Sequence, residues 1–281
     1  MKTSTVHHIR ILDLSIKRST VVKIGIIGCG NLGLSILNGI QQNMTGIQIV
    51  ASKRDISNLR QFESENTRFT TDNKLLIKES EILIFALKPY TLIPFLEEHA
   101  DLLKNSKHTV ISCATGIRLD EIQKAIGDEI GIYRAMPNTA AAVNESVTAI
   151  SRTNDPLNNT RKVEEIFKSL GTVIHIDEDL MESATILGAC GVAYVLRFMR
   201  AMIQGGIEVG FNAQTATEIV SQTMKGAAQL IIQNQTHPEE EIDKVTTPKG
   251  CTIVGLNEME HAGFSSALIK GIVASYNKIE Q

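Results

Sequence analysis

A glycine-rich stretch near the start of the chain has residue types and spacing that suit a pyrophosphate. Gly28, Gly30 and Gly33 form a GxGxxG pattern between the β-branched run 21–27 and a helical stretch over residues 31 to about 42. The first glycine allows a tight turn, the second lets the backbone approach phosphates, and the third permits close helix–strand packing. The helix start adds free N–H groups and the positive end of its dipole. This strand–turn–helix context predicts a dinucleotide site, although GxGxxG alone is often only a turn.

The segment after the second predicted strand (residues 47–51) indicates which dinucleotide binds. An NAD site usually has an acid about 20 residues beyond the last glycine, where it bonds the ribose 2′-OH. This chain has Ser52, Lys53 and Arg54 there instead. One hydroxyl and two cations suit a 2′-phosphate, which Arg54 can hold bidentately. We therefore favour NADP(H) over NAD(H). A solvated basic turn, with Asp55 serving only as the N-cap of a helix, is the alternative.

A second candidate site is the stretch Thr-Thr-Pro-Lys-Gly-Cys-Thr over residues 246–252. Thr247 fits the N-cap and Pro248 the first position of a helix. The N–H groups of Gly250, Cys251 and Thr252 would then point into one small volume and bind a carboxylate without a charged side chain. The alternative is a plain capped helix start.

Polar or small residues also follow several predicted strands. These loops are Ala-Leu-Lys-Pro at 86–89, Ser-Cys-Ala-Thr-Gly at 112–116 and Arg-Ala-Met-Pro-Asn-Thr at 134–139. Open α/β sheets bind ligands beyond the carboxyl ends of their strands. Each loop alone is more often just a turn, but together they predict a cleft along one sheet edge.

No residue stands out as a dedicated proton donor. The seven histidines are scattered, no Ser/His/Asp or Cys/His pairing can be argued, and no metal site is predicted. Hydride transfer to a carbonyl usually needs such a donor. The nitrogen of a C=N bond can already carry the proton, which leaves the protein mainly to position the reactants. This pattern favours imine reduction.

The elements that position these residues alternate between strand and helix as far as about residue 176. Strand-like runs at 21–27, 47–51, 82–86, 109–113, 130–135, 147–151 and 172–176 are separated mostly by helical segments. Such alternation predicts an α/β fold with a parallel sheet and right-handed crossovers. From residue 177 the pattern becomes all-α, with long helices expected over 178–211, 213–234 and 265–279. Residues 1–20 form an extension of unknown role.

Composition and charge exclude several classes of protein. A net charge of −3 and 4% aromatic residues argue against nucleic acid as a partner. The four scattered cysteines fit reduced thiols in the cytoplasm. The N-terminus lacks the apolar core of a signal peptide, and the apolar run 184–196 is shorter than the roughly 20 residues of a membrane span. A helix over 184–210 that is apolar on most sides must still be buried, and a second subunit is the expected cover.

Taken in order, these motifs resemble the pyrroline-5-carboxylate reductase family, whose members make proline from its cyclic imine with NAD(P)H. The matching stretches are GCGNLG, Thr-Asp-Asn at 71–73, ALKP, residues 112–116, RAMPNT, VTTPKGCT and residues 255–264. The resemblance runs from about residue 22 to residue 281. It implies a Rossmann-like NADP-binding domain over residues 21–176 and an all-α domain over 177–281. The latter would interlock two subunits into a homodimer, which in this family often joins a larger ring.

The resemblance also assigns site residues. The substrate carboxylate would lie on the N–H groups around Gly250, Cys251 and Thr252, beside Thr247, and the Thr252 hydroxyl would act in catalysis by meeting the ring nitrogen. Glu178 matches a position near bound proline analogues. The cofactor would contact Gly28, Gly30, Asn31, Leu32, Gly33, Ser52, Lys53, Arg54, Asn73, Ala86, Leu87, Lys88, Pro89, Cys113 and Ala114.

The chain departs from the family pattern in places. Lys249-Gly250 stands where the family usually has two glycines, and LGACGVAY at 187–194 replaces a usual Ser-Gly-Ser-Gly-Pro-Ala-Tyr stretch. Ala140 and Ser146 replace a common Pro and Gly. We expect reduction of L-1-pyrroline-5-carboxylate to L-proline by NADPH. The alternatives are a reductase of another cyclic imine or 2-oxo acid, and a dinucleotide-binding oligomer without turnover.

Overall fold

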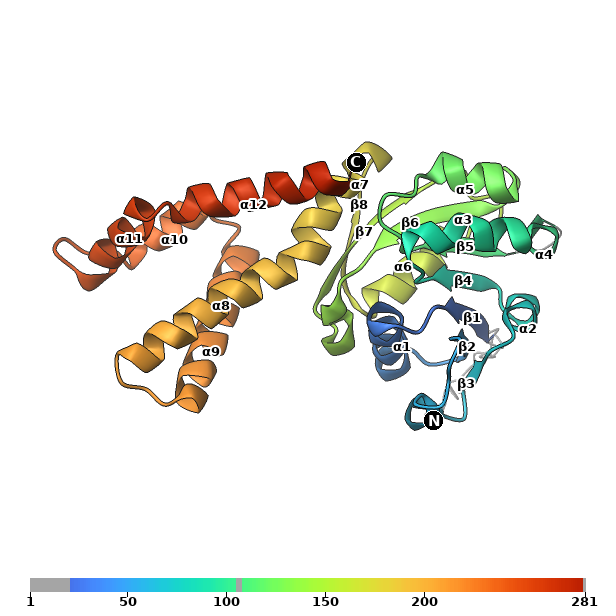
Figure 1. Ribbon diagram of the computed structural model, residues 1–281, viewed down its shortest axis with the longest axis horizontal. Coiled ribbons are helices and arrows are strands. Elements are labelled where there is room, and N and C mark those ends of the chain that lie inside the picture. The colour runs from blue at the N-terminus through green and yellow to red at the C-terminus, as the bar shows by residue number, and fades with distance from the viewer. Residues whose placement is uncertain (1–20, 105–107, 280–281) are drawn as a thin grey trace, which may run out of the picture.

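Two regions of different character lie end to end in the molecule (Figure 1). The computed structural model describes residues 21–104 and 108–279. Strands and helices alternate from β1 to β8 at one end, and the helices from α7 onward extend away as an arm. We call these regions the sheet unit (residues 22–175) and the helical arm (residues 178–279). The N-terminal extension expected at residues 1–20 lies outside the described residues.

The sheet unit contains one eight-stranded sheet in the order β3-β2-β1-β4-β5-β6-β7-β8. Neighbouring strands are parallel except for β6 and β7, which are antiparallel. Ile27 at the end of β1 pairs with Ser52 on one side and Phe85 on the other, so these carboxyl ends lie level at one edge. The strands are β1 (Val22–Ile27), β2 (Ile47–Ser52), β3 (Thr67–Thr70), β4 (Ile82–Phe85), β5 (Thr109–Ser112), β6 (Gly131–Met136), β7 (Ser146–Arg152) and β8 (Gly171–His175).

Helices cover both faces of this sheet. Ile24 and Ile26 of β1 belong to one core cluster with α1 and α6, whereas Ile27 belongs to another with α2, α3 and α5. Strands buried on both faces explain the apolar runs in the sequence and confirm the predicted Rossmann-like α/β fold. The helices are α1 (Asn31–Asn43), α2 (Asn73–Glu79), α3 (Pro89–Glu98), α4 (Ala100–Lys104), α5 (Leu119–Ile126) and α6 (Thr160–Lys168), with 3-10 helices at Arg60–Phe62 and Thr139–Val143.

The sheet unit differs from the sequence prediction in some details. β7 runs antiparallel to β6 because residues 137–145 are fewer than the roughly dozen that a parallel crossover needs. Strand β3 was not predicted, since Phe69 is its only apolar residue. The prediction of a helix capped by Asp55 is wrong. Its carboxylate instead accepts the Ser57 N–H at 2.9 Å in a turn that leads to the first 3-10 helix.

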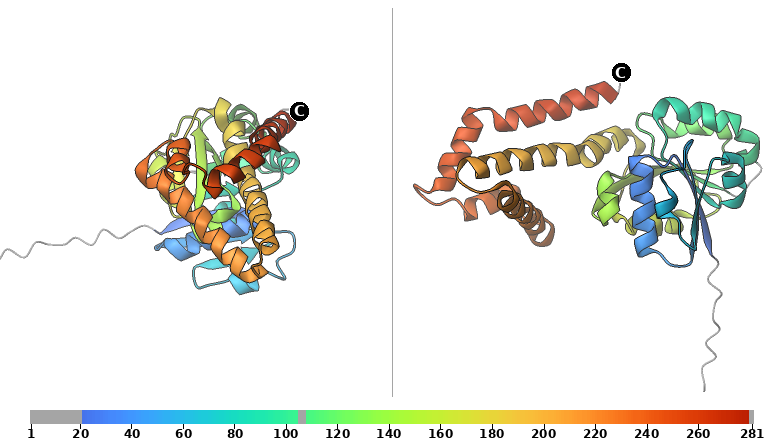
Figure 2. Two further views of the ribbon diagram at one scale, coloured as in Figure 1. Left: turned by 90° about the vertical axis from the view of Figure 1, so that its left-hand side faces the viewer. Right: turned by 60° about the horizontal axis from the view of Figure 1, so that its bottom comes forward.

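The helical arm begins with a 3-10 turn at Glu178–Leu180 and ends close to the sheet unit again (Figures 1 and 2). The helices predicted over 178–211, 213–234 and 265–279 are present, but a π-helical segment interrupts the first at Thr185–Cys190. We call that segment the π-turn. The arm contains α7 (Met181–Ala184), α8 (Gly191–Glu208), α9 (Ala213–Asn234), α10 (Pro238–Lys244), α11 (Cys251–His261) and α12 (Phe264–Ile279).

Much of the arm's apolar surface is uncovered in a single chain. Leu187, Leu196 and Val209 are each more than half exposed. A cavity of about 660 Å³ lies among α8, α9, α11 and α12 and is lined mostly by apolar side chains. By length and composition alone, the helical run Glu178–Glu208 could cross a membrane. Apolar helix faces of this extent need a cover, which can be protein or lipid.

Candidate active site

The loop between β1 and α1 has the form that the GxGxxG pattern predicts. Gly28 has a φ of +100°, and a Cβ there would lie 2.6 Å from the Ala86 carbonyl oxygen. A Cβ on Gly33 would lie 2.3 Å from the Gly28 carbonyl oxygen. Glycine is therefore required at the first position by backbone conformation and at both by close packing.

Gly30, the middle glycine, faces open space instead. No atom lies within 4 Å of the position that its Cβ would occupy. Gly30 is the N-cap residue of α1, and no side chain caps this helix. The N–H groups of Asn31, Leu32 and Gly33 consequently have no acceptor within the helix, and that of Leu34 is the first to bond, to Gly30 at 2.9 Å. This end of α1 fits a pyrophosphate, although binding by these residues stays a prediction.

The end of β2 brings two predicted cofactor residues together. The buried Ser52 hydroxyl donates to Asn73 Oδ1 at 2.7 Å. Asn73 opens α2, which Asp72 caps by accepting the Leu75 N–H at 3.0 Å. Lys53 and Arg54 follow Ser52 and are exposed. Two long cationic side chains, and no carboxylate, therefore come directly after β2. This combination suits a 2′-phosphate.

The loops after β4 and β5 continue this edge. Lys88 is the N-cap residue of α3 and Pro89 its first residue, so Ala86 and Leu87 form the link from β4. Cys113 is buried next to Ala114, and its N–H donates to Phe85 at 2.9 Å.

Two cysteines belong to this edge, Cys29 in the glycine loop and Cys113 after β5. Burial raises the pKa of each thiol to about 12. Both thiols are therefore neutral at physiological pH and serve as small apolar packing groups rather than nucleophiles.

A cavity of about 400 Å³ lies between the sheet unit and the arm. It adjoins residues 113–118, which link β5 to α5 and which we call the β5 loop. Thr115 contributes from the loop, and the π-turn and the end of α12 supply the other walls. Sequence reasoning missed these walls because α12 lies far from β5 along the chain. The lining residues are Thr115, Thr185, Ile186, Cys190, Ala274, Ser275, Lys278 and Ile279.

The stretch 246–252 ends in a helix start, but not at the predicted residue. Gly250, not Thr247, is the N-cap of α11, which begins at Cys251. The Gly250 N–H donates to the Thr247 carbonyl at 2.9 Å, and Lys249 has a φ of +60°. Pro248 and Lys249 are thus the central residues of a β-turn, and proline is favoured at the first of these two positions. A helix that began at Pro248 would instead have a left-handed residue at its second position.

This correction changes which N–H groups are free. Gly250 uses its N–H in the turn, so the free donors are those of the first helical residues, Cys251 and Thr252. A Cβ on Gly250 would lie 2.6 Å from Thr247 Oγ1, so glycine is needed where the turn meets the helix. The carboxylate-binding role of this helix start stays a prediction.

We call the sheet edge that carries the glycine loop and the loops after β2, β4 and β5 the cofactor edge. The structure does not bring Thr252 to this edge of the same chain. Figures 1 and 2 show α10 and α11 at the end of the arm that lies away from the sheet unit. Cys251 and Thr252 are both exposed there. A site that joins Thr252 to the cofactor edge therefore requires a second chain.

Glu178 lies at the junction of the two regions. Its Oε1 accepts the Leu119 N–H at 2.6 Å and an Arg134 N–H at 3.3 Å. The fully buried Arg134 also donates to Glu182 Oε1 at 2.6 Å. These bonds fasten the start of the arm to β6 and α5. The role of Glu178 as a substrate ligand stays a prediction, and in one chain the start of the arm at α7 does not lie beside α11, which carries Thr252.

Sequence reasoning overlooked the Arg134 junction, although a signal was present. Arg134 stands inside an apolar strand, where a cation needs acidic partners. Glu178 and Glu182 are spaced four residues apart, which places two carboxylates on one face of a helical segment.

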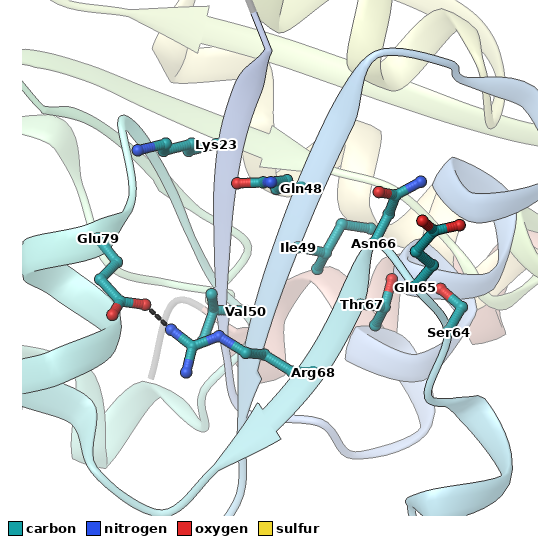
Figure 3. A pocket seen from close by; sticks show the side chains of 10 residues that line it. All are labelled: Lys23, Gln48, Ile49, Val50, Ser64, Glu65, Asn66, Thr67, Arg68 and Glu79. Atoms are coloured by element: carbon teal, nitrogen blue, oxygen red, sulfur yellow. Dashed lines mark ion pairs between the residues drawn. The ribbon is translucent and has the colours of Figure 1, made fainter.

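A separate pocket of about 380 Å³ lies toward the amino ends of β1 and β2 (Figure 3). Lys23, Gln48 and the Arg68–Glu79 ion pair are among its polar lining residues. The predicted cofactor residues follow the carboxyl ends of the strands, so this pocket is not part of the same site.

Comparison with protein families assigns both regions. Residues 178–281 match the family described as pyrroline-5-carboxylate reductase dimerisation. Residues 23–116 match the family described as NADP oxidoreductase, coenzyme F420-dependent. The first match covers the region whose apolar helices are uncovered in one chain, and it supports protein rather than lipid as their cover.

Curated proteins are similar over most of the chain. Pyrroline-5-carboxylate reductase 1 of Dictyostelium discoideum is 41% identical over 272 residues, and the match covers 91% of this chain but 49% of that protein. Pyrroline-5-carboxylate reductase 2 of the same organism is 39% identical, with 91% of both chains covered. The pyrroline-5-carboxylate reductase of Methanosarcina acetivorans is 32% identical, covering 92% of this chain and 97% of its own.

A solved structure agrees with these relatives. The Plasmodium falciparum pyrroline carboxylate reductase with NADP bound superposes with a TM-score of 0.83 at 25% identity, covering 92% of this chain and 97% of that chain. A glycine loop between a strand and a helix, a helical arm that matches a dimerisation family and relatives covered over more than nine-tenths of their length agree with one another. The chain belongs to the pyrroline-5-carboxylate reductase family.

Proposed function

We propose that the protein reduces L-1-pyrroline-5-carboxylate to L-proline with NADPH. The observation that carries this proposal is the glycine loop, where Gly30 leaves the start of α1 open beside a β2 end at which Ser52, Lys53 and Arg54 precede any acid. The curated relatives add the substrate, since their names state pyrroline-5-carboxylate reductase. When bound, NADPH supplies the hydride that C5 of the imine accepts.

The residues of the chain bind and orient the reactants. The N–H groups of Asn31, Leu32 and Gly33 would hold the pyrophosphate, and Arg54 the 2′-phosphate. The free N–H groups of Cys251 and Thr252 would hold the substrate carboxylate at the start of α11.

The Thr252 hydroxyl would meet the ring nitrogen of the substrate. A protonated ring nitrogen already carries the hydrogen that the amine product keeps, so hydride addition to C5 completes the reaction without another proton donor. The proposed reaction therefore requires no acid catalyst from the cofactor edge. Its thiols, Cys29 and Cys113, are locked in the neutral form.

We further propose that the active unit is a homodimer whose sites each combine two chains. The domain division at residues 21–176 and 177–281 then has a functional meaning. The first domain holds the cofactor, and the second carries Thr252 to a partner's cofactor edge. The exposed apolar arm and the distance of α11 from the sheet unit support this assignment. Assembly of dimers into a larger ring and a cytoplasmic location, which suits four free cysteines, belong to the same proposal.

A second candidate is a reductase of another cyclic imine or 2-oxo acid. Cys190 is the observation that favours this candidate. It belongs to the stretch 187–194, which departs from the family pattern, and it lines the cavity beside the β5 loop. The third alternative is a dinucleotide-binding oligomer without turnover.

One experiment separates the three alternatives. Oxidation of NADPH by the purified protein is followed with L-1-pyrroline-5-carboxylate, with a panel of other cyclic imines and with 2-oxo acids, and NADH is run in parallel. The proposal predicts fastest turnover with L-1-pyrroline-5-carboxylate and NADPH. Faster turnover of another imine or oxo acid supports the second candidate, and binding of NADPH without any turnover supports the third.

A further inference from the structure

The π-turn at Thr185–Cys190 stands where the arm leaves the sheet unit. A single π-helical turn within an α-helix is rare and often marks a functional position. Here it lies between α7 and α8 and packs closely on β7, since a Cβ on Gly188 would lie 3.2 Å from Val147 Cγ1. This close contact limits how the turn can shift.

A side chain from another element holds the π-turn in place. Asn138 is 6% exposed and lies beyond the end of β6, and its Nδ2 donates to the Gly188 carbonyl oxygen at 2.9 Å. Its Oδ1 accepts the Ala140 N–H at 2.9 Å, and its own N–H donates to Ser146 Oγ at 3.0 Å. Because Oδ1 is engaged by a donor, the amide can present only Nδ2 to Gly188. The two side-chain bonds therefore fix the orientation of the amide, and the backbone bond to Ser146 holds the residue itself.

The π-turn is also a wall of the 400 Å³ cavity that adjoins the cofactor edge. It contributes Thr185, Ile186 and Cys190, opposite Thr115 of the β5 loop. In a Rossmann-like sheet with this strand order, the dinucleotide crosses from the β2 side toward β4 and β5. The reacting end of the cofactor would then lie at this cavity, and the π-turn would set the position of the ring that receives the hydride.

From these contacts we infer that Asn138 is a positioning residue for hydride transfer. It acts through the π-turn and does not touch the reacting atoms. The inference rests on the proposed function and adds to it the element that places the imine. A displacement of about 1 Å in the reacting pair can cost about 100-fold in rate, so one lost bond to the turn is enough to be measured.

The test compares two buried asparagines. Asn138→Asp keeps the shape of the side chain but sets an oxygen against the Gly188 carbonyl, which removes the donor. Asn159→Asp is the matched control, because Asn159 is also nearly buried and its Nδ2 donates to Thr109 Oγ1 at 2.9 Å, at the opposite end of β5 from the cavity. Each variant is assayed as the full chain for kcat, for both KM values, for thermal stability and for the deuterium isotope effect with deuterated NADPH.

The expected result is a split between the two variants. Asn138→Asp should lower kcat about 10-fold or more and raise the isotope effect, with the KM for NADPH within about twofold of wild type. Asn159→Asp should lose thermal stability while kcat and the isotope effect stay near wild type. Equal kinetic changes in both variants, or an unchanged kcat in Asn138→Asp, would overturn the inference.

A second variant covers the case in which Asn138→Asp does not fold. Gly188→Ala pushes the π-turn from its other side, against Val147, and should give the same kinetic signature. A Gly188→Ala protein with wild-type kcat and isotope effect would contradict the inference. Absence of any wild-type turnover overturns the proposed function and the inference together, whereas wild-type turnover with matched losses overturns only the inference.

Discussion

The sheet unit and the helical arm differ in how much of their structure one chain completes. In the sheet unit, both faces are covered and the glycine loop leaves the space in front of α1 open. In the arm, Leu187, Leu196 and Val209 are exposed, and α11, which carries Thr252, lies at the end away from the sheet unit. Under the proposed function, one chain would therefore complete the cofactor site, whereas reduction would need the assembly.

The largest effect is expected from filling the space beside Gly30. In Gly30→Val the side chain occupies the open volume where the pyrophosphate would approach, so affinity for NADPH should fall by about 100-fold or more, while the fold is kept. Titration of NADPH and thermal unfolding measure the two quantities. Gly33→Ala is the contrasting variant, because its Cβ would collide with the Gly28 carbonyl and lower stability. Normal NADPH binding by Gly30→Val would show that the phosphates lie elsewhere.

The next effect concerns the arm. Thr252→Ala removes the hydroxyl that we propose meets the ring nitrogen, and kcat/KM for the imine should fall between about 10-fold and 100-fold, as expected for one hydrogen bond to a charged group. Affinity for NADPH should stay at the wild-type value. Thr246→Ala is the control from the same loop, since its hydroxyl only donates to the Ile242 carbonyl at 2.7 Å. Unchanged kinetics in Thr252→Ala would remove this residue from the mechanism.

A smaller effect is expected from a substitution in the sheet unit that tests the preference for NADPH over NADH. Arg54→Ala removes a cation that has no acidic partner among the ion pairs of the described residues. The KM for NADPH should rise about 10-fold, and the KM for NADH should hardly change, because only the former has the 2′-phosphate. Steady-state kinetics with both cofactors measure the ratio. An equal rise for both would mean that Arg54 does not read the 2′-phosphate.

The smallest effect is expected in the turn before α11. Lys249 has a φ of +60°, a conformation that costs an ordinary residue about 1 kcal/mol relative to glycine. Lys249→Gly should therefore raise the free energy of unfolding by up to about 1 kcal/mol, less the extra entropy that glycine gives the unfolded chain. Chemical unfolding measures the change. A stability loss in this variant would mean that the Lys249 side chain makes contacts that outweigh its backbone strain.

The sequence predicted those parts of the fold that depend on local pattern. Apolar runs located seven strands, and most of these are buried on both faces, which requires apolar residues at almost every position; the edge strand β8 is the more exposed exception. The GxGxxG loop followed from spacing, since Gly28 and Gly33 meet local steric demands and Gly30 leaves open the space in front of α1. Strand β3 escaped because it is a polar edge strand, and the antiparallel β7 became evident only from the short connection after β6.

The rest of the site depends on contacts between distant segments. The cavity walls join Thr115 to α12, and the buried Arg134 meets Glu178 and Glu182 of the arm. Such pairings between distant segments leave no periodic pattern of residues in the sequence. The stretch 246–252 shows a subtler limit, because Thr247 and Pro248 fit a helix start locally, yet the left-handed Lys249 turns the chain once more before α11 begins.

The most direct test of the central claim uses dimers in which each chain lacks a different half of the site. Gly30→Val and Thr252→Ala chains, carrying different purification tags, are expressed together and the mixed dimers are isolated. If each site combines two chains, a mixed dimer has one site with both defects and one intact site, so it should regain about half of the wild-type activity per dimer. Activity no higher than that of the two parent variants would place Thr252 and the cofactor in the same chain and contradict the account.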